Sequence, residues 1–115
     1  AESGDHRFRI EVLYQTDRNG GLSGQARVLE QSTSRDLRGG LLWFFAPDNP
    51  EMLVKLLEGC AVNAHWWVFV SGLTDVGYTV TVTDTATGEQ WTRENPDRNL
   101  ALPVSDVEAF PCSLP

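Results

Sequence analysis

The stretch HWWVFVSGLTDVGYTVTVTDTATGEQW, residues 65–91, decides the fold class of this chain. In its second half, Tyr78, Val80 and Val82 alternate with threonines. An apolar period of two is typical of a half-buried β-strand, and β-branched residues favour that conformation. The turn sequence DTATG follows, and residues 89–93 then predict a returning strand. The stretch therefore predicts a β-hairpin.

The first half of the same stretch predicts a strand inside a sheet, because residues 65–71 are apolar on both faces. Trp66 and Trp67 are neighbours, and neighbouring side chains of a strand point to opposite sides of the sheet. We expect one indole in the core. The other lies on the outer face, either covered by a loop or the proline-rich tail, or exposed to stack on sugars or dock a protein.

The chain before residue 50 predicts further strands. Residues 8–14 alternate with a period of two, residues 25–31 do so more weakly, and LRGGLLWFFAP, residues 37–47, is apolar on both faces. The polar segment TDRNGGLSG, residues 16–24, predicts a turn or loop. The chain after residue 95 carries four prolines and predicts mostly extended coil.

The segment after Pro50 fits either a helix or a strand. Asn49 could cap a helix that Gly59 ends. A period of two instead places Met52, Val54 and Leu56 on one face and Leu53, Lys55 and Leu57 on the other. Only about eight residues lie between Pro50 and Gly59, which is short for a helix and normal for a strand. We therefore favour a strand for residues 51–57.

These patterns predict an all-β fold in a single domain, residues 1–115. Short strands at roughly ten-residue spacing, with turn residues between them, indicate an antiparallel β-sandwich of about seven strands. We expect it to be immunoglobulin-like and closed by one disulfide. The length of 115 residues is enough for one core and too short for two.

Charge and hydropathy exclude two classes of partner. The net charge is −7, and the nine basic residues form no cluster. Nucleic acids and anionic lipid surfaces both require concentrated positive charge, so we expect neither as a partner. The apolar runs are too short for a membrane span.

Cys60 and Cys112 are the only cysteines. A zinc site needs four ligands, and the two histidines, His6 and His65, do not have ligand spacing. We therefore predict a disulfide, with a reduced and buried pair as the alternative. Together with Ala1 in place of an initiator methionine, this favours an exported protein, either secreted or periplasmic.

The run GGLLWFFAPDNPEMLVKLLEGCAVNAHWWVFVSGLTDVGYTVTVTDTATGEQWTREN, followed by DVEAF, resembles a domain of predicted secreted proteins from environmental bacteria. Those proteins share the order W-F-F, V-K, G-C, W-V-F, D-T-x-T-G and A-F. The resemblance covers about residues 39–110. It implies an exported β-domain of uncharacterised function and favours a strand at residues 51–57. It supplies no catalytic residue, and this chain departs from the pattern at Ala64-His65-Trp66, where glycine more often precedes the aromatic residue.

The sequence does not predict catalysis. No serine lies in a G-x-S-x-G motif that would pair with His6 or His65. A glycosidase needs two carboxylates, and Glu51 with Glu58, or Asp75 with Asp84, could be nominated. With 16 acidic residues such pairs are unavoidable, so a solvated acidic surface is the simpler interpretation.

Two loops carry oxygen ligands of the kind that calcium accepts. The residues are Asp17 and Asn19 in one loop and Asp48, Asn49 and Glu51 in the other. Neither loop has the spacing of a dedicated calcium loop, and Asp and Asn also occur in turns for local reasons. We expect no cofactor and retain calcium only as an alternative.

The functional hypothesis is a non-catalytic, exported binding or structural module. Its candidate ligand-binding residues are Trp43, Trp66, Trp67 and Trp91. The expected partner is a protein or a polysaccharide at the cell exterior. The alternatives are a carbohydrate-binding module, a subunit that self-assembles through an unpaired edge strand or the chain ends at residues 1–7 and 96–115, and, last, a small hydrolase.

Overall fold

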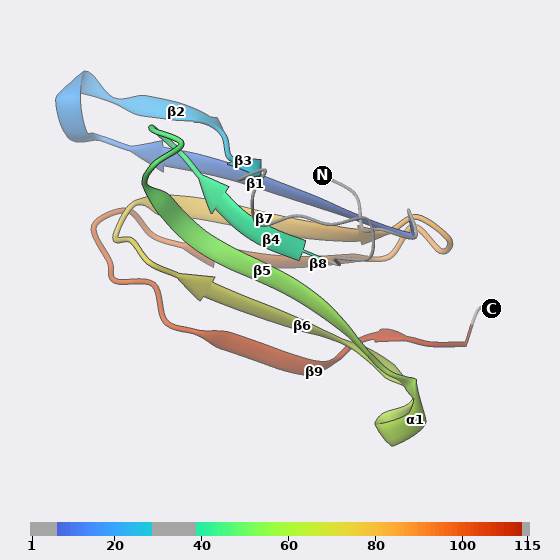
Figure 1. The fold of residues 1–115 in the computed structure, drawn as a ribbon. Coiled ribbons are helices and arrows are strands. Elements are labelled where there is room, and N and C mark those ends of the chain that lie inside the picture. The colour runs from blue at the N-terminus through green and yellow to red at the C-terminus, as the bar shows by residue number, and fades with distance from the viewer. Residues whose placement is uncertain (1–6, 29–38, 114–115) are drawn as a thin grey trace.

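A computed structural model describes residues 7–28 and 39–113, and it folds into two stacked β-sheets (Figure 1). His6 and the end of the strand expected at residues 25–31 lie outside the described residues. Among the described residues, no helix is long and apolar enough to cross a membrane.

The first sheet has four strands in the order β2-β1-β7-β8. They are β1 (Phe8–Thr16), β2 (Leu22–Gln25), β7 (Gly77–Asp84) and β8 (Gln90–Asn95). All neighbours are antiparallel, with Val12 opposite Val80 and Val82 opposite Trp91. The threonine-rich β7 is thus an inner strand between β1 and β8.

The second sheet has five strands in the order β3-β4-β5-β6-β9. They are β3 (Arg27–Val28), β4 (Gly39–Trp43), β5 (Pro50–Gly59), β6 (His65–Gly72) and β9 (Val104–Pro111). All neighbours are again antiparallel. Because β2 and β3 are separated only by Ala26, the chain passes there directly from one sheet to the other.

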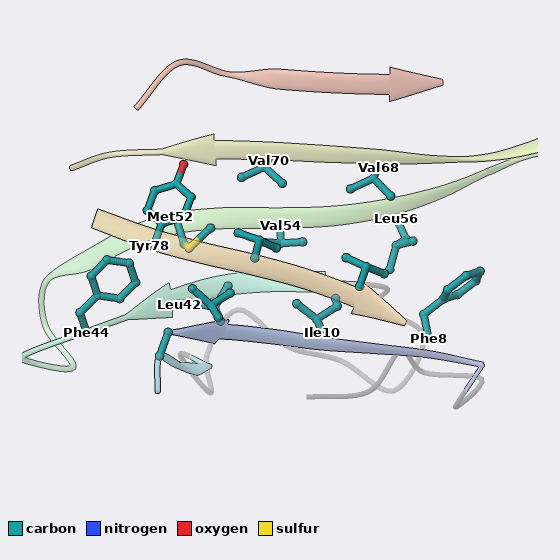
Figure 2. Close-up of a cluster of buried hydrophobic side chains, with 14 of the residues drawn as sticks. Phe8, Ile10, Leu42, Phe44, Met52, Val54, Leu56, Val68, Val70 and Tyr78 are labelled. Atoms are coloured by element: carbon teal, nitrogen blue, oxygen red, sulfur yellow. The ribbon is translucent and has the colours of Figure 1, made fainter. Parts of the chain in front are cut away.

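The core lies between the sheets, where the inward side chains of both layers point toward one another (Figure 2). From Met52 to Leu56 in β5 and from Trp66 to Val70 in β6, every second residue is buried, as the period of two requires. Trp66 joins this core with its ring centroid 4.8 Å from that of Phe8. Other members are Ile10, Val12, Leu42, Phe44, Met52, Val54, Leu56, Val68, Val70, Tyr78, Val80, Val82 and Phe110.

The structure confirms an all-β, antiparallel sandwich with one disulfide. It also confirms the strand at residues 51–57, because β5 pairs with both β4 and β6. β6 is an inner strand of its sheet, as its two apolar faces indicate. The described residues form nine strands rather than about seven, and the immunoglobulin-like connectivity stays a prediction.

Two strands lie where the sequence did not predict them. In the chain after residue 95, expected to be mostly extended coil, Val104–Pro111 forms β9 and pairs with β6, whereas residues 96–103 form no strand. An edge strand buries few side chains, and β9 has Pro103 just before it and Pro111 at its end. Its sequence therefore shows no clear alternation of apolar and polar residues. Leu22–Gln25 forms the short strand β2, although residues 22–24 were expected in a turn or loop. Two short helical segments also occur, η1 (Arg18–Gly20) and α1 (Cys60–Asn63).

The predicted disulfide between Cys60 and Cys112 is present, with a Cα–Cα distance of 5.9 Å across 52 residues of sequence. Cys60 begins α1 and Cys112 follows β9. The backbone N–H of Cys112 also donates to the carbonyl of Ala64 at 2.9 Å. The bond therefore attaches the end of β9 to the connection between β5 and β6.

Candidate functional site

The side of the five-stranded sheet that faces away from the core is largely apolar, and we call it the outer apolar face. Along β4, β5 and β6 the alternate residues are buried in the core, which places the intervening apolar side chains on the outer side; on β9, Val107 is exposed next to half-buried Asp106. Leu53, Leu57 and Val107 are 41%, 40% and 43% exposed. The face consists of Leu41, Trp43, Leu53, Leu57, Trp67, Phe69 and Val107.

Strand register brings these side chains together in rows across the sheet. Leu41 pairs with Leu53, and Leu57 pairs with Trp67. Directly opposite side chains on one face of a sheet lie within contact distance. The row that contains Lys55 and Phe69 lies between these two apolar rows.

Trp67 is held in one orientation on this face. Its indole N–H donates to Asn63 Oδ1 at 2.9 Å. Gly59 leaves room for the ring, since a Cβ atom there would overlap Cε2 and Nε1 of the indole. Asn63 belongs to α1 and Gly59 ends β5, so the connection between β5 and β6 fixes the ring before any ligand arrives. In the proline-rich tail, one of the covers considered for this indole, Val104–Pro111 forms β9 at the edge of the same sheet.

The aromatic rings of the face do not form a flat platform. Trp67 and Phe69 have ring centroids 6.4 Å apart and an interplanar angle of 76°. Trp43 lies beneath the guanidinium of Arg27, whose Cζ is 5.6 Å from the ring centroid. Sugars stack on flat, accessible ring faces, so this edge-to-face arrangement suits irregular side chains better than a polysaccharide chain.

Lys55 lies in the middle of the outer apolar face. It belongs to β5, the central strand of five, and pairs with Gly39 on one side and Phe69 on the other. Leu53 and Leu57 flank it along the strand, and its side chain is exposed. Lys55 thus stands among apolar neighbours, and the Arg27 guanidinium over Trp43 is a second cationic group on the same side of the sheet, on a chain whose net charge is −7.

The outer side of the four-stranded sheet is polar by contrast, and we call it the threonine face. Its rows run Arg9, Thr83, Gln90 and then Glu11, Thr81, Thr92. The next row, Leu13, Thr79 and Glu94, adds one exposed leucine. The two outer surfaces of the sandwich therefore differ in kind: one is apolar with a central lysine, and the other carries hydroxyl and charged groups.

The four tryptophans predicted to bind a ligand do not share one surface. Trp43 and Trp67 lie on the outer apolar face, whereas Trp66 is in the core and 4% exposed. Trp91 lies on β8 and donates its indole N–H to Asp106 Oδ2 of β9 at 2.8 Å. It therefore connects the edges of the two sheets.

The residues nominated for catalysis either lie far apart or form ion pairs and hydrogen bonds within the protein. Glu51 and Glu58 lie at opposite ends of β5. Asp75, just before β7, pairs with Arg18 at 2.6 Å, and Asp84, the last residue of β7, pairs with Arg7 at 2.9 Å. His65 Nδ1 lies 2.8 Å from the carbonyl of its near neighbour Asn63. None of these contacts pairs an acid with a base over a cleft.

The residues nominated for calcium are partly engaged within the protein. Asn49 Nδ2 donates to Glu51 Oε1 at 3.0 Å, and Glu51 is buried. Asp17 pairs with Arg98 at 2.8 Å. Across residues 7–28 and 39–113, no group of three or more His, Cys, Asp or Glu side chains could hold a metal ion.

Asp97 organises the loops at one end of the sandwich. Its carboxylate accepts hydrogen bonds from the backbone N–H of Asp17 at 2.9 Å, the hydroxyl of Thr16 at 3.1 Å and the N–H of Gly77 at 3.2 Å. These donors, the Asp17 N–H above all, lower the pKa of Asp97 to about 2. The carboxylate thus joins the β1–β2 connection to the start of β7.

We expect the Asp97 contribution to stability to disappear in acid. A pKa lowered from 3.8 to about 2 means that the contribution is complete above about pH 4 and is lost as the pH falls toward 2. Urea unfolding measured between pH 2 and 5 checks this. Asp97→Asn should flatten the pH dependence in that range, and Thr16→Val, which removes one donor, should flatten it partly. An unchanged slope in Asp97→Asn would contradict the assignment.

Sequence reasoning missed most of the outer apolar face. It selected Trp43 and Trp67 but not Leu41, Phe69 or Val107 as site residues. The signal was present at residues 51–57, where a period of two already placed leucines on both faces of one strand. An inner strand apolar on both sides needs a second cover, either in the protein or in a partner.

No family model, curated protein or solved structure matches this chain. The resemblance to a domain of secreted bacterial proteins accordingly stays an expectation.

Proposed function

We propose that this domain is a non-catalytic, exported binding module that recognises a protein partner through its outer apolar face. The observation that carries the proposal is the contrast between the two outer surfaces of one sandwich. Monomeric proteins rarely expose large contiguous apolar patches unless these patches bind something. The Cys60–Cys112 disulfide supports export, since such bonds persist in oxidising compartments.

The chemistry of the face favours a protein over a polysaccharide. Leucines at positions 41, 53 and 57 are three of its seven members, and the Trp67 and Phe69 rings meet at 76°. Protein interfaces combine such aliphatic residues with rigid aromatic anchors. Trp67, held by Asn63 and seated over Gly59, is the expected anchor.

Lys55 defines the charge that the partner presents. Two copies of the outer apolar face stacked about a twofold axis would place Lys55 near its own copy, and like charges across an interface are unfavourable. A different protein can instead offer a carboxylate surrounded by apolar side chains. The expected partner surface is therefore apolar with an acidic centre.

A peptide library displayed on phage tests this proposal. We expect selection on the immobilised domain to enrich peptides that combine Leu, Phe or Trp with Asp or Glu. Leu57→Asp and Trp67→Ala should each weaken the enriched peptides by at least about tenfold, because central anchors contribute more than 1 kcal/mol. Isothermal titration calorimetry measures the affinities.

Matched changes on the opposite surface give the control. Thr81→Asp introduces the same charge as Leu57→Asp on the threonine face and should leave peptide affinity unchanged. Enriched peptides that bind the Leu57→Asp protein as tightly as the original would contradict the proposal. Tryptophan-dependent binding to a panel of polysaccharides, without peptide enrichment, would instead establish the carbohydrate-binding alternative.

A further inference from the structure

Strand β8 leaves one edge of the four-stranded sheet open. The N–H of Asp84 donates to the carbonyl of Glu89 at 2.9 Å, which makes these two residues a hydrogen-bonded pair. Bonded and non-bonded pairs alternate along antiparallel strands. The backbone groups of Gln90, Thr92 and Glu94 therefore point away from β7, and no other strand of the described residues pairs with this edge.

The corresponding edge of the five-stranded sheet is closed by its own side chains. Asn63 Nδ2 donates to the carbonyl of Val107 at 2.7 Å, and Asp106 Oδ1 accepts from the N–H of Glu108 at 2.9 Å. Pro111 has no N–H to offer, and the β6–β9 register shifts between Trp66 and Val68. These are the devices that protect an edge strand from pairing.

The sequence of β8, Gln90–Asn95, is complementary to itself in antiparallel pairing. With Thr92 opposite the partner's Thr92, Gln90 lies opposite the partner's Glu94, and Trp91 lies opposite the partner's Arg93. Amide with carboxylate, indole with guanidinium and threonine with threonine are all favourable cross-strand pairs. Moving the centre of the pairing from Thr92 to Arg93 would place Arg93 opposite the partner's Arg93. Moving it to Glu94 would place Glu94 opposite the partner's Glu94, so both of these registers bring like charges together.

Apolar side chains lie beside this open edge. A cleft of about 430 Å³ is lined by Thr92, Arg93 and Glu94 of β8 and by Leu100 and Leu102 of the following loop, among others. The two leucines are 79% and 76% exposed. A second copy paired at β8 would cover them, so apolar burial would add to the backbone hydrogen bonds.

We propose that two copies of this domain pair through β8 to form a twofold symmetric dimer. The two four-stranded sheets become one continuous sheet with Thr92 at the symmetry axis. Because the twofold axis of an antiparallel strand pair is perpendicular to the sheet, both outer apolar faces point to the same side. The dimer is then bivalent, and a partner with repeated sites would bind it with increased avidity.

Charge reversal at the symmetry axis tests the pairing. Wild-type protein should show a sedimentation coefficient that rises from monomer to dimer between about 1 μM and about 1 mM. Thr92→Lys and Thr92→Glu each place like charges opposite one another, so each variant should stay monomeric. An equimolar mixture of the two should dimerise at lower concentration than either variant alone.

Thr81→Lys is the matched control, because Thr81 pairs with Thr92 on the same face but lies on the inner strand β7. It should dimerise like the wild type, and circular dichroism should show that all variants are folded. The proposal would be overturned if the wild-type protein stays monomeric, or if the mixture of Thr92→Lys and Thr92→Glu dimerises no better than either variant alone. Loss of the dimer in Leu57→Asp but not in Thr92→Lys would assign self-association to the outer apolar face instead.

Discussion

Reduction of the Cys60–Cys112 disulfide is expected to lower the free energy of unfolding by about 4 kcal/mol. The bond closes a loop across 52 residues, and the loss of chain entropy in the unfolded state grows with the logarithm of that length. A domain of this size is stable by only about 5–15 kcal/mol. The bond therefore supplies a large fraction of the total.

Urea unfolding of the oxidised protein and of the Cys60→Ser/Cys112→Ser variant measures this effect. The paired substitution removes the bond and leaves no free thiol. The midpoint should fall, and the end of β9 should lose hydrogen-exchange protection first, because the bond attaches it to the β5–β6 connection. Equal stability of the two proteins would show that packing of β9 against β6 is sufficient without the bond.

Arg7→Met is expected to destabilise the fold by about 3–5 kcal/mol, the cost of leaving a buried charge without its partner. Asp84 is completely buried at the end of β7, and both of its oxygens accept from Arg7, at 3.1 and 2.9 Å. The guanidinium also lies 5.2 Å from the Phe8 ring centroid and 5.6 Å from that of Trp66. Removing the guanidinium therefore leaves the Asp84 carboxylate without its ion-pair partner and also removes packing against Phe8 and Trp66.

A second substitution separates these two contributions. Adding Asp84→Asn to Arg7→Met removes the uncompensated charge and should recover part of the lost stability. Arg7→Lys keeps the positive charge but cannot form the bidentate hydrogen bonds. Its free energy of unfolding should lie between those of the wild type and Arg7→Met. If the double variant is as unstable as Arg7→Met, the cost comes from lost packing on Phe8 and Trp66 rather than from the charge.

The sequence predicted the layers of this fold because strand periodicity is a local property. Alternation at Tyr78, Val80 and Val82 was sufficient to indicate a strand, whereas residues 51–57 fitted a helix or a strand and were assigned by the short span between Pro50 and Gly59. The edge strands were harder: β2 buries few residues, and β9 carries Ser105, Asp106 and Glu108 between its apolar positions. Their pairing depends on neighbours that are distant in sequence.

The candidate site was predictable only in part, for a related reason. Adjacent Trp66 and Trp67 had to face opposite sides, so one indole on the outer face of the sheet could be expected. The sequence does not reveal that Leu41 lies opposite Leu53 and Leu57 opposite Trp67, because register is set by the assembled sheet. The central position of Lys55 likewise appears only after the order of the five strands is known.

The measurement that tests the account most directly is two-dimensional NMR of the labelled domain titrated with an enriched acidic, apolar peptide. Our account predicts that shift changes cluster at Leu53, Lys55, Leu57, Phe69 and the indole N–H of Trp67. The resonances of Thr79, Thr81 and Thr83 should stay in place. Shift changes confined to the threonine face, with the Trp67 indole unchanged, would contradict the claim that the outer apolar face is the recognition surface.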